Sequence, residues 1–180
     1  MRQGSIRIMV TAALFAALVT VATVVVAIPL PGQGYANLGD GVVILTGCLL
    51  GPLWGGLAAA VGSLLADIYL GFALYAVASF MIKGLMAVVA YFVYTWLFKL
   101  SKKAILAVVS ASLLGEVIMV GGYYLFEERL WDGVVALASL PGNILQGGVG
   151  VMTASLILLA LNKSRLLSKW QESLHATSNP

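Results

Sequence analysis

Long apolar runs, interrupted by Gly, Pro and charged residues, dominate the chain from residue 6 to residue 161. A helix needs about 20 apolar residues to cross a bilayer, so the runs predict an all-α membrane protein with six transmembrane helices. The expected spans are residues 6–28, 40–50, 53–70, 74–98, 104–126 and 138–161.

The second span is short for a helix that crosses the bilayer upright. At 1.5 Å per residue it reaches only about 17 Å of the roughly 30 Å hydrocarbon core. Either it is a half-helix that ends in a tight turn at Gly51-Pro52, or these residues kink a single longer span. Gly-Pro is a strong breaker, which favours the turn.

The positions of basic residues test the number of spans. With six spans and a cytoplasmic N terminus, Arg129 alone among the ten Lys and Arg residues falls in an outer segment, and Lys83 alone lies deep within a span. The others lie in inner segments, as the positive-inside rule requires. Merging the second and third spans would place Lys99, Lys102 and Lys103 outside, so the charges favour six spans with both termini cytoplasmic.

Composition excludes several classes of protein. The chain is 61% apolar and 9% charged, whereas soluble domains carry about 25% charged residues. We expect one transmembrane domain over residues 1–180, with a cytoplasmic tail from about residue 163, in the cell membrane of a bacterium. Topology explains the net charge of +3, so it does not indicate a nucleic-acid partner. Cys48 and His175 are each alone of their kind, which argues against a disulfide framework, a metal site or any other cofactor.

Two ionisable residues lie deep within spans, Lys83 in the fourth and Glu116 in the fifth. A charge at mid-membrane costs at least about 2.5 kcal/mol on insertion scales, so each needs a partner or a wet cavity. They could form a purely structural ion pair with each other. Alternatively, together with Asn143 and Gln146 on the sixth span, they face a polar pocket, which is the interpretation we favour.

Polar and aromatic residues near the outer ends of the spans add candidates for that pocket. Aromatic residues at this depth are usually interfacial anchors, but some could stack on a flat ligand. The predicted substrate-binding residues are Asn37, Asp40, Tyr75, Lys83, Glu116, Tyr123, Asn143 and Gln146.

Small residues in the first span allow another helix to approach closely. They form two overlapping small-xxx-small pairs, made by Ala12, Ala13, Ala16 and Ala17. One interpretation is packing within the chain, and the other is a docking surface for a separate membrane subunit.

Several sequence motifs resemble those of the S components of energy-coupling factor (ECF) transporters. They are residues 35–40 (YANLGD), 49–56 (LLGPLWGG), 62–67 (GSLLAD), 71–75 (GFALY) and 80–85 (FMIKGL). The match is closest to the branch for riboflavin, hydroxymethylpyrimidine or pyridoxine and spans most of the chain.

The resemblance implies a six-helix subunit that captures a water-soluble vitamin in a pocket near the outer face. It also implies partners, namely a transmembrane T component, docked on the small residues of the first helix, and two cytoplasmic ATPases. No G-x-x-x-x-G-K-[ST] motif occurs in the sequence, which fits ATP hydrolysis by partner chains and a subunit that is not itself an enzyme.

We therefore expect substrate capture without catalysis, with a hydroxymethylpyrimidine- or pyridoxine-like compound as the substrate. Two other functions stay open. One is a self-sufficient, proton-coupled secondary transporter in which Glu116 relays the proton. The other is a structural membrane assembly protein that binds no small ligand.

Overall fold

The computed structural model describes residues 3–29 and 34–164, which form five helices and one short β-hairpin. In chain order the elements are α1 (Gln3–Val25), β1 (Ala27–Pro29), β2 (Tyr35–Asn37), α2 (Gly39–Leu70), α3 (Ala73–Ser101), α4 (Ala104–Leu130) and α5 (Gly133–Lys163). Residues 30–33 of the predicted first outer loop, and residues 165–180 of the predicted tail, lie outside the described residues.

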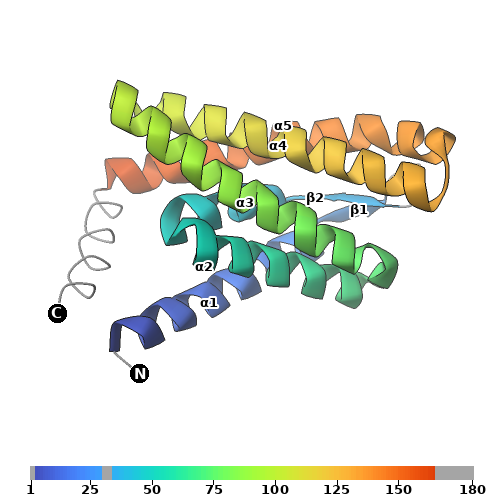
Figure 1. Cartoon of the computed structure of the whole chain (residues 1–180), viewed down its shortest axis with the longest axis horizontal. Coiled ribbons are helices and arrows are strands. Elements are labelled where there is room, and N and C mark those ends of the chain that lie inside the picture. The colour runs from blue at the N-terminus through green and yellow to red at the C-terminus, as the bar shows by residue number, and fades with distance from the viewer. Residues whose placement is uncertain (1–2, 30–33, 165–180) are drawn as a thin grey trace.

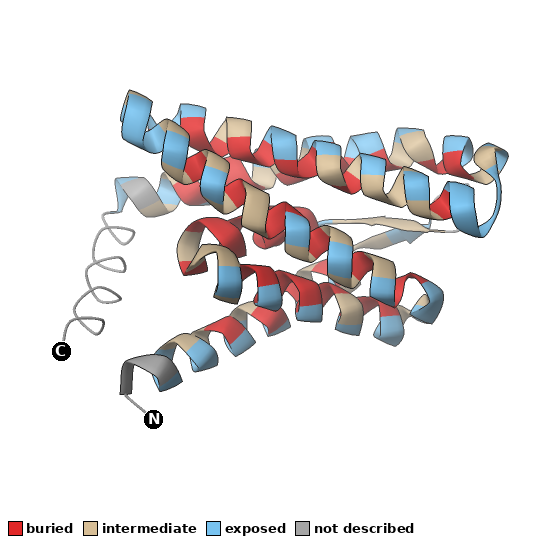
Figure 2. Ribbon diagram, viewed as in Figure 1, coloured by how far each residue is buried: buried red, intermediate tan, exposed pale blue. Residues whose placement is uncertain are grey.

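Each of the five helices is long and apolar enough to span a membrane. Their outward sides carry large apolar residues such as Leu14, Val77 and Leu145, which are more than half exposed. In Figure 2 the pale-blue, exposed parts of the helices lie mainly on their outer sides, and the red, buried parts lie mainly toward the other helices. Such a surface is stable only in hydrocarbon, so the chain is a multi-pass membrane protein, as the sequence predicted.

The predicted break at Gly51-Pro52 is confirmed, and it lies within α2. Gly51 has φ 83° and ψ 178°, a conformation that favours glycine, and Pro52 follows it. The Thr46 hydroxyl donates to the Gly55 carbonyl at 3.0 Å, although residues nine apart in a straight helix are separated by about 13 Å. The chain therefore turns back sharply at Gly51. The expected second and third spans correspond to the two halves of α2.

The first half of α2 is the centre of the molecule. Every residue from Gly39 to Cys48 is buried, so other elements cover this helix on all sides. The approach of α3 is close enough that a Cβ at Gly47 would overlap the carbonyl of Ala87. The polar residues in the first half of α2 can therefore reach lipid or bulk water only through a cavity.

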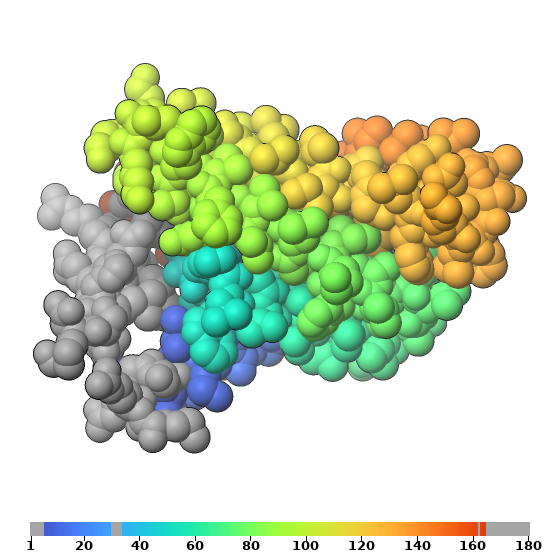
Figure 3. All heavy atoms as spheres, viewed as in Figure 1, coloured from blue at the N-terminus to red at the C-terminus, as the bar shows by residue number. Residues whose placement is uncertain are grey.

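The remaining helices surround this central segment. α1 packs against α2, α3 packs against both α2 and α4, and α5 contacts α4 and α2. Figure 1 shows this order, with the first described turn of α1 and the last of α5 at the same end of the molecule. The space-filling view in Figure 3 shows α3 filling the space between α4 and the second half of α2.

The hairpin is a feature that the sequence pattern did not predict. β1 and β2 pair antiparallel, with Ile28 opposite Ala36. The first span was expected to continue to residue 28, but α1 ends at Val25 and the next residues enter β1. Three-residue strands are too short to produce a periodic pattern, and the apolar residues of β1 extend the run of α1 without a break. The hairpin lies where α1 leads into α2, and it contributes Tyr35 and Asn37 to the site described below.

Candidate functional site

An ion pair joins α2 to α3 in the interior. The Lys83 ammonium bonds to Oδ1 of Asp40, and both side chains are almost completely buried. The other carboxylate oxygen of Asp40 accepts from Nε2 of Gln146 on α5 at 2.6 Å. Gln146 in turn accepts from the backbone N–H of Asn37 at 3.0 Å. Three helices and the hairpin therefore share one polar network.

Lys83 pairs with Asp40 and not with Glu116, which corrects the pairing considered from the sequence. Asp40 lies in the first turn of α2, and its buried carboxylate contacts Lys83 and Gln146. Glu116 lies against Gly147 and Gly150 of α5. Both of its carboxyl oxygens are buried without a hydrogen-bond partner in the described part of the chain.

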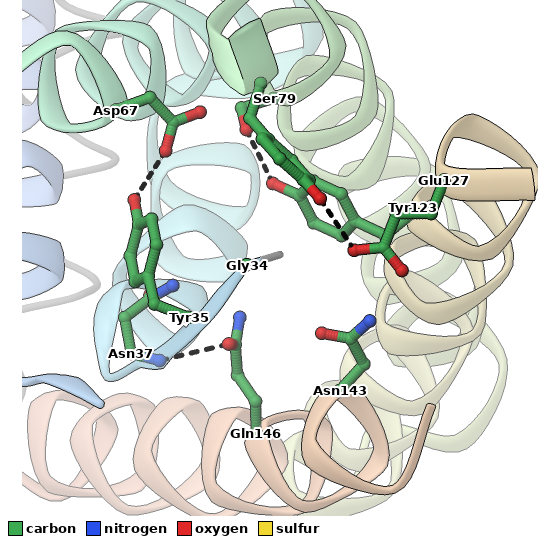
Figure 4. A pocket seen from close by; sticks show the side chains of 10 residues that line it. Gly34, Tyr35, Asn37, Asp67, Ser79, Tyr123, Glu127, Asn143 and Gln146 are labelled. Atoms are coloured by element: carbon green, nitrogen blue, oxygen red, sulfur yellow. Dashed lines mark hydrogen bonds between the residues drawn. The ribbon is translucent and has the colours of Figure 1, made fainter. Parts of the chain in front are cut away.

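A small cavity lies between this network and the hairpin. Figure 4 shows side chains from the hairpin and from α2, α3, α4 and α5 converging on it. It measures about 20 Å³, enough for one or two water molecules and far less than the 300 Å³ or more of a typical ligand pocket. Its lining residues are Gly34, Tyr35, Asn37, Asp67, Tyr75, Ser79, Tyr123, Glu127, Asn143 and Gln146.

Two tyrosine–carboxylate pairs form part of the cavity wall. Tyr35 of the hairpin donates to Oδ1 of Asp67 at 2.5 Å, and Tyr75 of α3 donates to Oε1 of Glu127 at 3.1 Å. Burial, followed by the Asp67 charge, raises the pKa of the Tyr35 phenol well above its usual range. Tyr35 therefore keeps its proton and remains a hydrogen-bond donor, which ties the hairpin to the end of α2.

Tyr123 connects the cavity to the ion pair. Its hydroxyl shares a hydrogen bond of 2.7 Å with Ser79, and the Lys83 ammonium lies 5.3 Å from the centre of its ring, within range of a cation–π interaction. The rings of Tyr75 and Tyr123 are neighbours, with centroids 6.4 Å apart. The cavity thus has an aromatic side as well as a carboxylate side.

The predicted site residues divide into two groups. Asn37, Tyr75, Tyr123, Asn143 and Gln146 line the cavity, whereas Asp40, Lys83 and Glu116 do not. Asp40 and Lys83 reach it only through Gln146 and Tyr123. The side-chain oxygen of Asn37 also accepts from the Gly39 N–H at the start of α2, at 2.8 Å.

Five lining residues are absent from the predicted substrate-binding set: Gly34, Tyr35, Asp67, Ser79 and Glu127. For Asp67 and Glu127 a signal existed, since both are carboxylates near the end of an apolar run and both are buried in the structure. Without the rotation of each helix they look like ordinary solvated end residues. Ser79 and Gly34 gave no comparable signal.

The four small residues of α1 have different environments. Ala12 and Ala16 are buried against Leu50 and Ala58 of α2, whereas Ala13 and Ala17 are exposed. The first pair is therefore committed to packing within the chain, which corrects the expectation that all four are free for docking. Only the second pair remains available to a separate subunit.

The arrangement suits noncovalent binding of a small polar molecule. Carboxylate, amide and hydroxyl groups converge on an aromatic-sided cavity under a short hairpin. In residues 3–29 and 34–164, no group of three or more His, Cys, Asp or Glu side chains is placed to hold a metal ion.

Three comparisons relate the chain to known proteins. Residues 3–163 match the family model described as ECF-type riboflavin transporter, S component. A protein of Pyrococcus woesei, described as an uncharacterized protein in the gap 3' region, is 36% identical over 135 residues, covering 74% of this chain and 87% of its own. A solved S component of a bacterial ECF transporter has the same fold, with a TM-score of 0.67 and 20% identity over 88% of this chain and 97% of its own.

Proposed function

The chain belongs to the family of ECF-type riboflavin transporter S components, and from this membership we propose that it captures a water-soluble vitamin or vitamin precursor for an ECF-type importer. It is accordingly a multi-pass protein of the cell membrane and a transporter subunit, not an enzyme. The observation that carries the proposal is the cavity under the hairpin, where polar side chains from four helices converge inside a lipid-facing protein. Such groups are costly to bury unless hydrogen bonds or opposite charges compensate them.

Six membrane passages with both termini cytoplasmic form part of this proposal. The reversal at Gly51 supports counting the halves of α2 separately, because Thr46 and Gly55 meet across it. The common location of the first turn of α1 and the last turn of α5 supports an even number of passages. The basic residues at that end, Arg7 and Lys163 among them, favour the cytoplasm by the positive-inside rule.

The partners in this proposal are a transmembrane T component and two cytoplasmic ATPases. The exposed pair Ala13 and Ala17 on α1 provides a thin surface against which a membrane helix could pack. Large exposed apolar residues, including Val10, Leu14 and Val21, flank the pair. This side of α1 is the docking surface that we propose for the T component.

For the substrate we propose a compound of the hydroxymethylpyrimidine or pyridoxine type. The small cavity volume favours a single ring over a larger molecule, because less of the hairpin and helix packing must move to admit it. Asn143 and Gln146 are suitable to orient polar ring substituents, and Tyr75 and Tyr123 to contact the ring face. In this assignment Asp40 and Lys83 act behind the cavity, by holding Gln146 and Tyr123 in position, and Glu116 packs against α5.

The direct experiment is a ligand screen on the full chain purified in detergent. Hydroxymethylpyrimidine, pyridoxine, riboflavin and other vitamins are added separately, and the melting temperature Tm is measured. Because a ligand that binds only the folded state stabilises it, we expect a dose-dependent rise in Tm for a single-ring compound. A flat response to every vitamin would contradict capture and would favour a structural assembly protein.

One observation favours a second candidate function. Both carboxyl oxygens of Glu116 are buried without a partner in the described residues, as expected of a group that takes up and releases a proton. A proton-coupled secondary transporter would accumulate substrate in liposomes that contain this chain alone and a proton gradient. Substitution of Glu116 by Gln should abolish that uptake, whereas an ECF subunit should show none without its ATPases.

A further inference from the structure

Asp67 and Glu127 each keep one oxygen without a hydrogen-bond partner in the described part of the chain. Tyr35 occupies Oδ1 of Asp67 and Tyr75 occupies Oε1 of Glu127, while Oδ2 and Oε2 are buried and unpaired. Both side chains are 2% exposed and both line the cavity. Figure 4 shows them on different sides of it. A buried acceptor without a donor is costly, so two such oxygens beside one cavity indicate that a ligand supplies the donors.

The charged side chains that line the cavity are two carboxylates, and no basic side chain of the described residues balances them there. No Lys, Arg or His belongs to the lining in the described ranges. The nearest buried cation, Lys83, is already paired with Asp40. An anionic ligand would therefore meet two carboxylates without a compensating charge, whereas a cation would neutralise part of their charge in a medium of low dielectric constant.

We propose that the substrate is a small ring that carries a positive charge or a protonatable amine and has N–H or O–H donors on two separate edges. One donor bonds to Oδ2 of Asp67 and the other to Oε2 of Glu127, and the ring contacts Tyr75 and Tyr123. Carboxylated and phosphorylated forms of the same ring are rejected. This inference rests on the proposed capture function and adds the charge of the ligand to it.

Three compounds with one ring and different charge make the test. Pyridoxamine, pyridoxine and 4-pyridoxic acid carry an aminomethyl, a hydroxymethyl and a carboxyl group at the same ring position. Their affinities for the full chain in detergent are measured by calorimetry at neutral pH. We expect pyridoxamine to bind tightest and 4-pyridoxic acid at least about tenfold more weakly, since a charge-assisted hydrogen bond is worth roughly ten- to a hundredfold in affinity.

Variants of the two carboxylates connect that preference to the cavity. Asp67→Asn and Glu127→Gln should each reduce the ratio between pyridoxamine and 4-pyridoxic acid by about tenfold or more. Glu128→Gln is the matched control, because Glu128 is the exposed neighbour of Glu127, and it should leave the ratio unchanged. The measurements on the unaltered chain decide the charge preference even if a variant folds poorly.

The outcomes separate this inference from the proposed function. If 4-pyridoxic acid binds as tightly as pyridoxamine, or if both cavity variants preserve the ratio, the charge preference is wrong and capture stands. If the three compounds fail and riboflavin binds, the charge preference is also wrong, because riboflavin carries no positive charge. If no vitamin binds at all, capture itself fails.

Discussion

The buried carboxylates of the interior and of the cavity have the same chemistry, but they differ in how many of their oxygens are hydrogen-bonded. Asp40, in the interior, bonds through one oxygen to Lys83 and through the other to Gln146. Asp67 and Glu127, beside the cavity, each bond to a tyrosine and keep a second oxygen unpaired. The interior group holds helices together, and the cavity group still has capacity for a ligand.

This difference separates structural from functional polar residues better than depth in the membrane does. A fully paired buried network stabilises one arrangement of the helices, whereas an incomplete one is costly until something completes it. Depth alone would give Lys83 and Glu116 the leading roles in binding. Hydrogen-bond satisfaction removes Lys83 from that role, and the position of the cavity separates Glu116, which does not line it, from Asp67 and Glu127, which do.

The largest expected effect comes from breaking the interior pair. Lys83→Met leaves the Asp40 carboxylate buried without its cation, and removal of one partner from such a pair typically costs about 3 to 5 kcal/mol of stability. The Tm in detergent should fall strongly, while Lys99→Met, at an exposed position of the same helix, should change it little.

A double variant tests the cause of that loss. Combining Lys83→Met with Asp40→Asn removes both charges, and it should recover part of the lost stability. If Lys83→Met melts like the unaltered protein, Asp40 does not depend on Lys83, and the interior network does not hold the helices together.

A smaller effect is expected at the cavity. Tyr35→Phe removes the hydroxyl that donates to Oδ1 of Asp67, at a cost of about 1.5 to 3 kcal/mol for a hydrogen bond to a charged group. Part of this loss should appear as weaker ligand binding, because Tyr35 also holds the hairpin over the cavity. Calorimetry and Tm together measure the two parts.

Tyr69→Phe is the matched control, since the Tyr69 side chain is 76% exposed and its hydroxyl should contribute almost nothing. A Tyr35→Phe variant with unchanged affinity and unchanged Tm would show that the hairpin is held by its backbone alone. The Tyr35–Asp67 pair would then play no part in binding, and Glu127 alone would remain as the cavity carboxylate that differs from Asp40.

The sequence predicted the helices, the break at Gly51-Pro52 and half of the residues that line the cavity, because each depends on local properties. Apolar length defines a span, and Gly-Pro interrupts a helix wherever it occurs. Asn143 and Gln146 were identified because they are polar groups in an apolar run. Asn37, Tyr75 and Tyr123, which were identified as polar or aromatic residues near the ends of spans, also line the cavity.

The pairing of these residues could not be predicted in the same way. A helix that is apolar on most sides has no polar face to show its rotation, so neither the Lys83–Asp40 pair nor the Tyr35–Asp67 pair has a sequence signature. The partition of the α1 alanines has the same origin. Only packing against α2 distinguishes Ala12 and Ala16 from Ala13 and Ala17.

The different environments of the α1 alanines give the prediction with the smallest effect on stability. They extend the comparison to apolar groups, because Ala12 is already packed against α2 and Ala13 is exposed. Ala12→Leu inserts a larger side chain into the contact with α2 and should cost about 1 to 3 kcal/mol. The side chain introduced by Ala13→Leu points away from that contact and should leave Tm and ligand affinity nearly unchanged.

If the exposed side of α1 is the docking surface, Ala13→Leu should nevertheless prevent co-purification with the T component, because a bulky residue separates helices that meet through small ones. The two variants add the same atoms one residue apart, so opposite outcomes can arise only from the direction in which each side chain points. Co-purification of Ala13→Leu at the normal level would exclude this side of α1 as the docking surface, whatever the fate of Ala12→Leu.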